Sequence, residues 1–329
     1  MNKCKIIYIK LICFFTLLFS LEFSKKYYFF FICCLKYFEY YHNLDKKCLS
    51  CPREILFNGL NILSPEDTLN EIINNNRSIS RFGDGEFNLI LGHKIGFQEV
   101  NLKLIKKLKK VLKSREKGLL IGIFLPYNNK YVKPFIYSVK RYIIKWIESR
   151  KKDIFSLIDL NREYYSSFIT RFYIFYKDKS KVPDYIKKFK QIWEKRDILI
   201  IEGEKSRLGV GNDLFNNSKS IKRILCPVKN AFKVYDKIIY QMKKIDKSNL
   251  ILLALGPTST VLAYDLYKLG FQVIDIGHID IEYEWFLRKA KKRIKIDNKY
   301  VNEVKGDRNK IGNITDKKYY KEIISRIIN

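Results

Sequence analysis

The sequence is poor in the residues that mark several common classes of protein. Only 15 of its 329 residues are glycine and 7 are proline, which excludes a collagen-like, mucin-like or wholly disordered chain. Six of the seven cysteines lie within the first 51 residues, and Cys226 is the only one beyond them. A disulfide-stapled secreted domain would carry cysteines throughout its folded part. The main body is therefore predicted to be a reduced fold of the cytosolic type.

The cysteines also give little support for a metal site of the zinc type. Cys48 and Cys51 have CxxC spacing, but no second CxxC pair and no nearby pair of histidines accompanies them. A structural zinc ion needs four ligands, so we expect these thiols to be incidental.

Acidic residues are scarce relative to basic ones. The chain has 64 Lys and Arg against 34 Asp and Glu, a formal net charge of +30. Such a charge suits anionic partners, namely nucleic acid, an anionic membrane surface or a phosphorylated ligand. Codon bias toward A and T would also enrich Lys together with Ile, Asn, Tyr and Phe, so the charge alone decides nothing. No recognisable nucleic-acid reader motif is present, and no specific nucleic-acid partner is expected.

Residues 1–50 form a hydrophobic N-terminal segment that differs from the rest. Its two apolar runs, Leu11–Leu21 and Tyr27–Leu35, are each shorter than the ~20 residues of a membrane-spanning helix. We expect residues 6–38 to associate with a membrane as an uncleaved anchor or an interfacial segment. A non-native extension without a role and a cleaved signal peptide are the alternatives.

From about residue 52 the pattern alternates between strands and helices. Short apolar or β-branched runs predict strands at 78–82, 119–124, 167–172, 197–201, 220–226, 250–255 and 272–276. Helical periodicity predicts helices at 102–112, 131–149, 231–244, 258–268 and 280–290. Repeated alternation favours an α/β fold, a three-layer sandwich with a mostly parallel sheet, over residues 52–290. Residues 291–329 are predicted to form a basic, peripheral C-terminal tail.

In such folds ligands bind beyond the carboxyl ends of the strands, so the loops there hold the candidate site residues. The first is the turn after strand 78–82, where Asp84 and Glu86 each follow a glycine. Hard oxygen ligands of this kind suit Mg²⁺ or Mn²⁺ shared with a diphosphate. Arg81, just before the turn, is placed to contact a phosphate or carboxylate. The alternative is a solvated turn in which Glu86 begins a helix.

Two further loops carry candidate donor-binding residues. The glycine-rich loop after strand 197–201 contains Lys205, Arg207 and Asn212, which would hold a phosphate or sugar hydroxyls; otherwise it is a surface loop with internal ion pairs. After strand 250–255, Gly256, Thr258 and Thr260 mark the start of a helix. The free N–H groups of a helix N-terminus bind anions, although the spacing is neither a P-loop nor GxGxxG and a plain helix cap would explain it too.

The fourth loop gathers acids in an otherwise basic chain. Asp280 and Glu284 would share one face of the helix at 280–290. Either is a candidate general base for an acceptor hydroxyl, unless these carboxylates only balance nearby lysines. His278 lies in the same stretch, and a lone histidine is more often structural than catalytic.

Four ordered segments together resemble the GT-D type glycosyltransferase family. They are RFGDGEF (81–87), IEGEKSRLGVGNDLF (201–215), LALGPTSTVLAYDL (253–266) and DIGHIDIEYEWF (275–286). The resemblance runs from about Pro65 to Ala290. It implies a Rossmann-like single domain that uses a metal and an Asp-X-Glu motif to bind a nucleotide sugar, typically UDP-glucose. The family's Asp-X-Glu falls on Asp84 and Glu86, and the arginine before it on Arg81.

The residues and the resemblance lead to one expected function. We expect a hexosyltransferase, dependent on Mn²⁺ or Mg²⁺, that moves a hexose from a UDP-sugar to a glycan acceptor in bacterial surface polysaccharide or glycoprotein synthesis. Its expected location is the cytoplasm, at the inner face of the membrane. A phosphate-ester hydrolase using the same metal, a basic nucleic-acid-binding protein and a non-catalytic membrane-associated partner are the alternatives.

Overall fold

The computed structural model describes residues 60–124, 129–304 and 311–328. The hydrophobic N-terminal segment 1–50, with the membrane association predicted for residues 6–38, lies outside these residues. Within the three described ranges, no helix combines the length and the apolar character needed to cross a bilayer.

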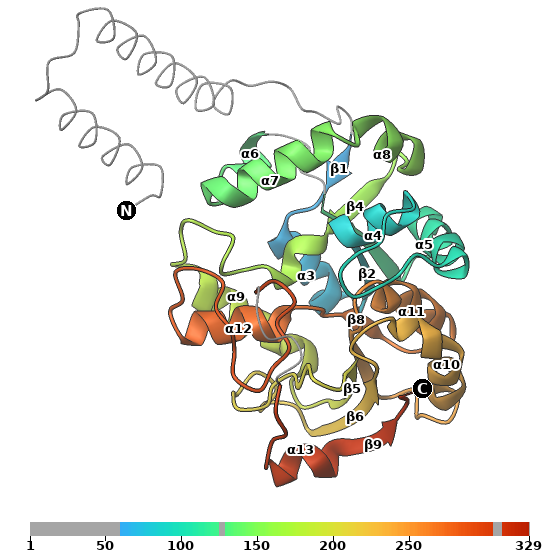
Figure 1. Cartoon of the computed structure of the whole chain (residues 1–329), viewed down its shortest axis with the longest axis vertical. Coiled ribbons are helices and arrows are strands. Elements are labelled where there is room, and N and C mark those ends of the chain that lie inside the picture. Colours follow the sequence, from blue (N-terminus) through green and yellow to red (C-terminus); the bar gives the residue numbers. More distant parts are fainter. Residues whose placement is uncertain (1–59, 125–128, 305–310, 329) are drawn as a thin grey trace, which may run out of the picture. The chain divides into compact units, whose positions relative to one another are not determined.

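One nine-stranded sheet organises the described chain, in the order β1-β4-β3-β2-β8-β7-β5-β6-β9 (Figure 1). Every neighbouring pair is parallel, so the expected α/β fold with its largely parallel sheet is confirmed. The strands are β1 (Asn61–Ile62), β2 (Ser78–Phe82), β3 (Leu119–Ile123), β4 (Glu163–Ser166), β5 (Asp197–Gly203), β6 (Ser220–Cys226), β7 (Leu250–Ala254), β8 (Val273–Asp275) and β9 (Ile323–Arg326).

The α-helices connect these strands. They are α3 (Pro65–Asn74), α4 (Asp84–Ile90), α5 (Leu102–Lys113), α6 (Asn129–Val132), α7 (Tyr137–Glu148), α8 (Lys151–Leu157), α9 (Val182–Lys190), α10 (Tyr235–Met242), α11 (Pro257–Lys268), α12 (Ile279–Leu287) and α13 (Lys317–Glu322). Short 3-10 turns occur at η1 (Ser167–Thr170), η2 (Gln191–Trp193) and η3 (Ala231–Val234).

The central strands are apolar on both faces, which makes the fold three layers thick. Along β7, Leu250 and Leu252 belong to one buried cluster, whereas Ile251 and Leu253 belong to another. This alternation is the two-residue period of a strand with both faces covered. Helices α4, α5, α7, α8, α10 and α11 contribute to the cluster on one face, and α3, α9 and α12 to the cluster on the other.

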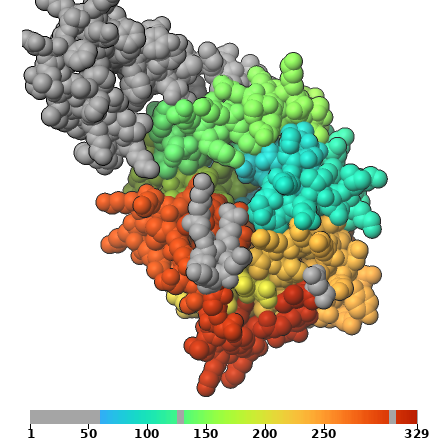
Figure 2. Space-filling model, in the orientation of Figure 1, coloured from blue at the N-terminus to red at the C-terminus, as the bar shows by residue number. Residues whose placement is uncertain are grey.

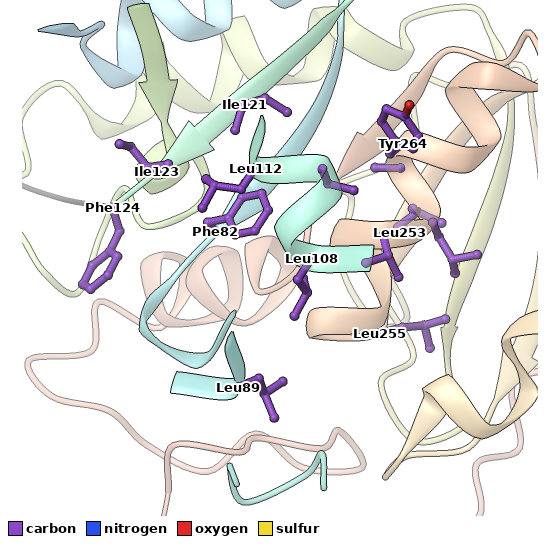
Figure 3. Close-up of a cluster of buried hydrophobic side chains, with 14 of the residues drawn as sticks. Phe82, Leu89, Leu108, Leu112, Ile121, Ile123, Phe124, Leu253, Leu255 and Tyr264 are labelled. Carbon is purple, nitrogen blue, oxygen red and sulfur yellow. The ribbon is translucent and has the colours of Figure 1, made fainter. Parts of the chain in front are cut away.

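The larger cluster joins helix α5 to the sheet. Leu108 and Leu112 of α5 lie in one buried group with Phe82 of β2 and Ile121 of β3 (Figure 3). On the surface, the side chains of α4 and α5 (cyan) adjoin those of α10 and α11 (amber) (Figure 2). This packing fixes β2, and with it the turn that follows β2.

Two predicted elements differ from the observed ones. The helix predicted at 131–149 is divided into α6 and α7, because Pro134 lacks an N–H group and disfavours helical backbone at the residue before it. The apolar run 167–172 was expected to be a strand, but the strand β4 ends at Ser166. There the Ser166 hydroxyl accepts a hydrogen bond from the Phe168 N–H at 3.2 Å and the chain enters η1.

The C-terminal residues differ from the peripheral tail that the sequence predicts. Strand β9 pairs with β6 and forms one edge of the sheet. Just before it, Glu322 accepts a hydrogen bond from buried Arg223 of β6 at 2.7 Å. Contacts accordingly place the described C-terminal residues in the same compact unit as the rest of the sheet.

Candidate active site

A cavity of about 1050 Å³ opens at the carboxyl ends of the strands. Residues at or just beyond the ends of seven strands line it, among them Gly83, Phe124, Ser167, Gly203, Pro227, Gly256 and Gly277. In parallel sheets this edge is where ligands bind, because all the loops that follow the strands meet there. A cavity of this size accommodates a small-molecule substrate.

Two of these glycines hold their loops close to a neighbouring side chain. Gly277 has a φ of +41°, and a Cβ there would lie 2.3 Å from Nη2 of Arg81. Gly256 has a φ of +57°, and a Cβ there would lie 2.4 Å from the ring of Phe97. Any other residue at either position would strain the backbone and displace the cavity wall.

Asp84 and Glu86 both line the cavity, at the start of α4. The turn predicted after strand 78–82 is the first turn of this helix, with Gly83 as its N-cap. Oε2 of Glu86 accepts a hydrogen bond from the Gly83 N–H at 2.7 Å, and Oδ2 of Asp84 accepts one from the Tyr142 hydroxyl at 2.5 Å. Burial raises the pKa of Glu86 to about 7, and the charges of Asp275 and Asp84 add to the rise. Asp84, Glu86 and Asp275 therefore form a cluster of carboxylates at the carboxyl end of β2.

These two acids fit a divalent cation that a substrate helps to hold. Among residues 60–124, 129–304 and 311–328, no group of three or more His, Cys, Asp and Glu side chains is arranged to hold a metal by itself. Mg²⁺ in phosphate-transferring enzymes is commonly bound by one or two carboxylates together with substrate phosphates. One oxygen of Asp84 and one of Glu86 accept no hydrogen bond from another described residue. The donor set suits a metal–diphosphate complex.

Arg81 lines the cavity, but most of its N–H groups donate hydrogen bonds to other residues of the protein. Its Nε donates to the Asp275 carbonyl at 2.6 Å, and its Nη2 to Oδ1 of Asp275 at 3.1 Å. Its Nη1 donates to the Ser167 carbonyl at 3.0 Å and to Oγ1 of Thr170 at 2.6 Å. These bonds engage four of the five guanidinium N–H groups. Arg81 thus ties together the ends of β2, β4 and β8.

The loop after β5 reaches the cavity through different residues from those expected. Gly203, Ser206 and Leu208 line the cavity, whereas Lys205 and Arg207 are not part of its lining. The guanidinium of Arg207 donates to the carbonyls of Asn298 at 2.7 Å and Gly312 at 2.8 Å. Arg207 therefore fastens this loop to C-terminal residues.

The start of α11 contributes Gly256 to the cavity lining, but not Thr258 or Thr260. Oγ1 of Thr260 donates to the Arg81 carbonyl at 2.9 Å, a contact between α11 and β2. Thr258 is fully buried, and its hydroxyl finds no hydrogen-bond partner in the described part of the chain. Gly256 is thus the one predicted residue of this loop that lines the cavity.

Asp280 and Glu284 do share a face of α12, and a buried lysine joins them. Nζ of Lys299 donates to Oδ2 of Asp280 at 2.7 Å and to Oε1 of Glu284 at 3.0 Å. Nδ2 of Asn212 lies 2.8 Å from both Oδ1 of Asp280 and Oε1 of Glu284. Burial opposes ionisation of Glu284, but Lys299 and Asn212 hold its pKa below the ordinary value. Asp280 lines the cavity, whereas Glu284 does not.

A second charged group in the cavity wall has no counterpart among the predicted site residues. Glu303 accepts from Nη2 of Arg171 at 2.5 Å and pairs with Nε of Arg293 at 3.0 Å. Nε2 of His278 lies 3.8 Å from Oε1 of Glu303. Burial lowers the pKa of His278 to about 3, so its imidazole is neutral at physiological pH. Burial would raise the pKa of Glu303, but the positive charges of Arg171 and Arg293 lower it to about 2.

Lys299 and Glu303 were missed because they lie in the segment predicted to be a tail. Neither sits in a motif, and their partners precede them by many residues. Only the tertiary fold brings these charges together with their partners.

Comparison with known proteins finds one matching family and several similar proteins. The family described as "Glycosyltransferase GT-D fold" matches residues 79–304. The chain is 38% identical over 271 residues to the glycosyltransferase GlyD of Streptococcus pneumoniae, covering 80% of this chain and 32% of GlyD. It is 35% identical over 292 residues to the probable glycosyl transferase Gly of Streptococcus gordonii, covering 86% of this chain and 41% of that protein. The chain thus spans less than half of either relative.

Solved structures show the same architecture. A structure described as a domain of unknown function 1792 with a distinct glycosyltransferase fold matches with a TM-score of 0.78 at 37% identity, over 82% of this chain and 96% of that one. A glycosyltransferase of the same domain type from Streptococcus sanguinis matches with a TM-score of 0.77 at 32% identity, over 82% of this chain and 99% of that one.

Proposed function

The chain belongs to the family of glycosyltransferases with the GT-D fold, and from this premise we propose that it transfers a hexose, such as glucose, from a UDP-sugar to a glycan acceptor. The observation that carries the proposal is the position of Asp84 and Glu86. Both line a large cavity at the carboxyl ends of parallel strands, where a nucleotide's diphosphate binds in such sheets.

Asp84 and Glu86 would hold Mn²⁺ or Mg²⁺ together with the donor's diphosphate. When bound, such an ion supplies positive charge that stabilises the departing diphosphate. The chain's part is to present two carboxylates on the rigid first turn of α4. Glu86 would give up the proton that its raised pKa retains, because a neighbouring cation favours the charged form.

Backbone groups beside the acids would bind the rest of the diphosphate. The start of α11 offers few such groups, because Pro257 has no N–H and the Ser259 N–H donates to the Gly256 carbonyl at 2.8 Å. The N–H of Gly256, which lines the cavity, is the group of this loop that would reach the diphosphate. Arg81 would contribute its remaining N–H group. Of the other predicted donor-binding residues, we propose that Lys205, Arg207, Asn212, Thr258 and Thr260 support the walls around the donor.

Asp280 is the better placed of the two candidate bases, because it lines the cavity. Its oxygens accept hydrogen bonds from Lys299, Asn212 and the Gly209 N–H, which hold the carboxylate in one orientation. In the proposed reaction Asp280 takes the proton of the attacking acceptor hydroxyl. Glu284 would then act through Lys299 and Asn212, by holding them beside Asp280.

The proposed acceptor is a glycan of bacterial surface polysaccharide or glycoprotein, and the proposed location is the cytoplasmic face of the membrane. The names of the streptococcal relatives support glycosyl transfer as the reaction. The membrane assignment depends on residues 6–38.

The test is UDP release from UDP-glucose in the presence of Mn²⁺, with and without acceptor glycans. We expect Asp84→Asn and Glu86→Gln to lower turnover about 100-fold or more, because the ion's several kcal/mol of charge stabilisation is lost. Asp153→Asn, which changes an exposed acid of α8, is the matched control and should keep wild-type turnover.

Retained turnover in either cavity variant would refute the metal role. Release of the sugar only as free hexose, whichever acceptor is present, would instead favour a hydrolase.

A further inference from the structure

Tyr142 of α7 contacts one of the two carboxylates from a distant part of the chain. Its hydroxyl donates to Oδ2 of Asp84 at 2.5 Å, across 58 residues of sequence. The ring lines the cavity, and the residue is 52% exposed. An exposed tyrosine gains little from burial, so this hydrogen bond is its clearest specific interaction.

The two carboxylates differ in what fixes them. Glu86 is held by its own helix, because Oε2 accepts from the Gly83 N–H. Asp84, at the first position of α4, accepts no hydrogen bond from α4 or from any described residue other than Tyr142. Without that bond its side chain would be free to exchange between staggered rotamers.

The packing of α7 on α4 places the hydroxyl. Trp146, one turn after Tyr142, packs against Phe87 of α4 with ring centroids 6.1 Å apart, and against Phe124 at 4.8 Å. Phe87 lies three residues after Asp84, on the same side of α4. The buried Trp146–Phe87 contact therefore sets the register in which Tyr142 lies over Asp84.

We propose that Tyr142 is a positioning residue that holds Asp84 in the rotamer needed to bind the divalent cation. The inference rests on the proposed function, since it requires the ion to be bound at Asp84 and Glu86. Hydrogen-bond partners behind a metal ligand fix its orientation, and their loss typically lowers metal affinity about 10-fold to 100-fold. Tyr142 meets this description because its bond occupies one carboxylate oxygen and leaves the other.

The test compares Tyr142→Phe with Tyr137→Phe. Tyr137 is on the same helix, is 49% exposed and makes no hydrogen bond to an acid among the described residues, so it is a matched control. Mn²⁺ binding is measured directly by calorimetry in the presence of saturating UDP. We expect Tyr142→Phe to weaken Mn²⁺ binding about 10-fold or more and Tyr137→Phe to leave it unchanged. Thermal unfolding in EDTA should be the same for both variants.

A kinetic measurement separates positioning from general damage. In Tyr142→Phe the Mn²⁺ concentration for half-maximal UDP release should rise, and the maximal rate at saturating Mn²⁺ should approach that of wild type. Wild-type Mn²⁺ affinity in Tyr142→Phe, with loss of binding in Asp84→Asn, would overturn the role of Tyr142 alone. Absence of Mn²⁺ binding by the wild-type protein would overturn the metal site and this inference together.

Discussion

At the scale of single residues, the cavity depends on charged groups that the fold keeps partly out of water. Glu86 is the clearest case, since burial beside two other acids makes its ionised form unfavourable. Like charges held close together lower the free energy of unfolding, and a bound cation would offset this loss. Glu86, which suits the proposed chemistry best, is therefore a residue whose ionised form destabilises the unliganded protein.

Removing the Glu86 charge should stabilise the unliganded protein at neutral and higher pH. The folded-state pKa of about 7 lies above the ordinary value of 4.5 for a glutamate, so the folded protein binds this proton more tightly than the unfolded chain. The corresponding stability is present below pH 4.5 and is lost as the pH rises to 7. Glu86→Gln cannot ionise, and its amide oxygen can still accept from the Gly83 N–H.

The measurement is urea unfolding of both proteins in EDTA at pH 4.5, 6 and 8. The free energy of unfolding of Glu86→Gln relative to wild type should increase across this range by on the order of 2–3 kcal/mol. An unchanged difference from pH 4.5 to 8 would show that the carboxyl group titrates normally.

At the scale of elements, helix α12 and the chain that follows it form one wall of the cavity. Lys299 joins them, because this buried ammonium bonds to Asp280 and Glu284 of α12. Two nearby carboxylates without a cation would repel each other in surroundings that solvate them poorly. The ion pairs of Lys299 thus hold residues 291–304 against α12.

Lys299→Met should destabilise the protein by about 3–5 kcal/mol, the usual cost of removing one partner of a buried ion pair. Lys295→Met is the control, since Lys295 is exposed on the same segment and makes no ion pair with a described residue. Urea unfolding at pH 8 measures both. A loss below about 1 kcal/mol for Lys299→Met would mean that water or relaxation already compensates the two carboxylates.

At the scale of the whole molecule, the C-terminal residues complete the sheet. Strand β9 covers the edge of β6, and the Ile327 N–H donates to the Leu225 carbonyl at 2.7 Å. Arg223 of β6 is buried and pairs with both Glu202 of β5 and Glu322. The predicted tail is therefore part of the folded body.

Deleting residues 311–329 should destabilise the protein by at least about 3 kcal/mol, because β6 is uncovered and Arg223 loses a partner. It should also promote association, because an uncovered strand edge is a template for pairing. Glu322→Gln keeps the strand and removes one charge, so its loss should be smaller. Urea unfolding and size-exclusion chromatography measure these effects. Equal stability of the deletion variant and wild type would show that β9 contributes nothing to the fold.

The sequence predicts the central strands well, since they are short runs rich in apolar and β-branched residues. Strand β6 occupies 220–226 as expected, and β7 and β8 fall within one or two residues of their predicted ends. Strands β1 and β9 were not predicted, because edge strands are short and need no apolar run. Among candidate site residues, Asp84, Glu86, Arg81, Gly256 and Asp280 line the cavity.

The contacts of the other candidate residues, and the contribution of Tyr142, could not be predicted from sequence patterns. Arg207 and Asn212 are polar residues in a loop, and only tertiary structure shows that they bond to other parts of the chain. Tyr142 lies on an amphipathic helix. The helical period predicts which of its residues are buried, but not which carboxylate the Tyr142 hydroxyl contacts. Contacts of this kind depend on how helices pack, which local sequence does not specify.

The uniform direction of the strands has a practical consequence for handling the protein. The turn formed by residues 243–249 precedes β7, so it lies on the rim of the sheet opposite the cavity. Exposed Lys243 on this turn offers an amine for coupling to a solid support or a dye. Attachment there would leave the opening unobstructed, so ligands could reach an immobilised molecule as they reach a free one.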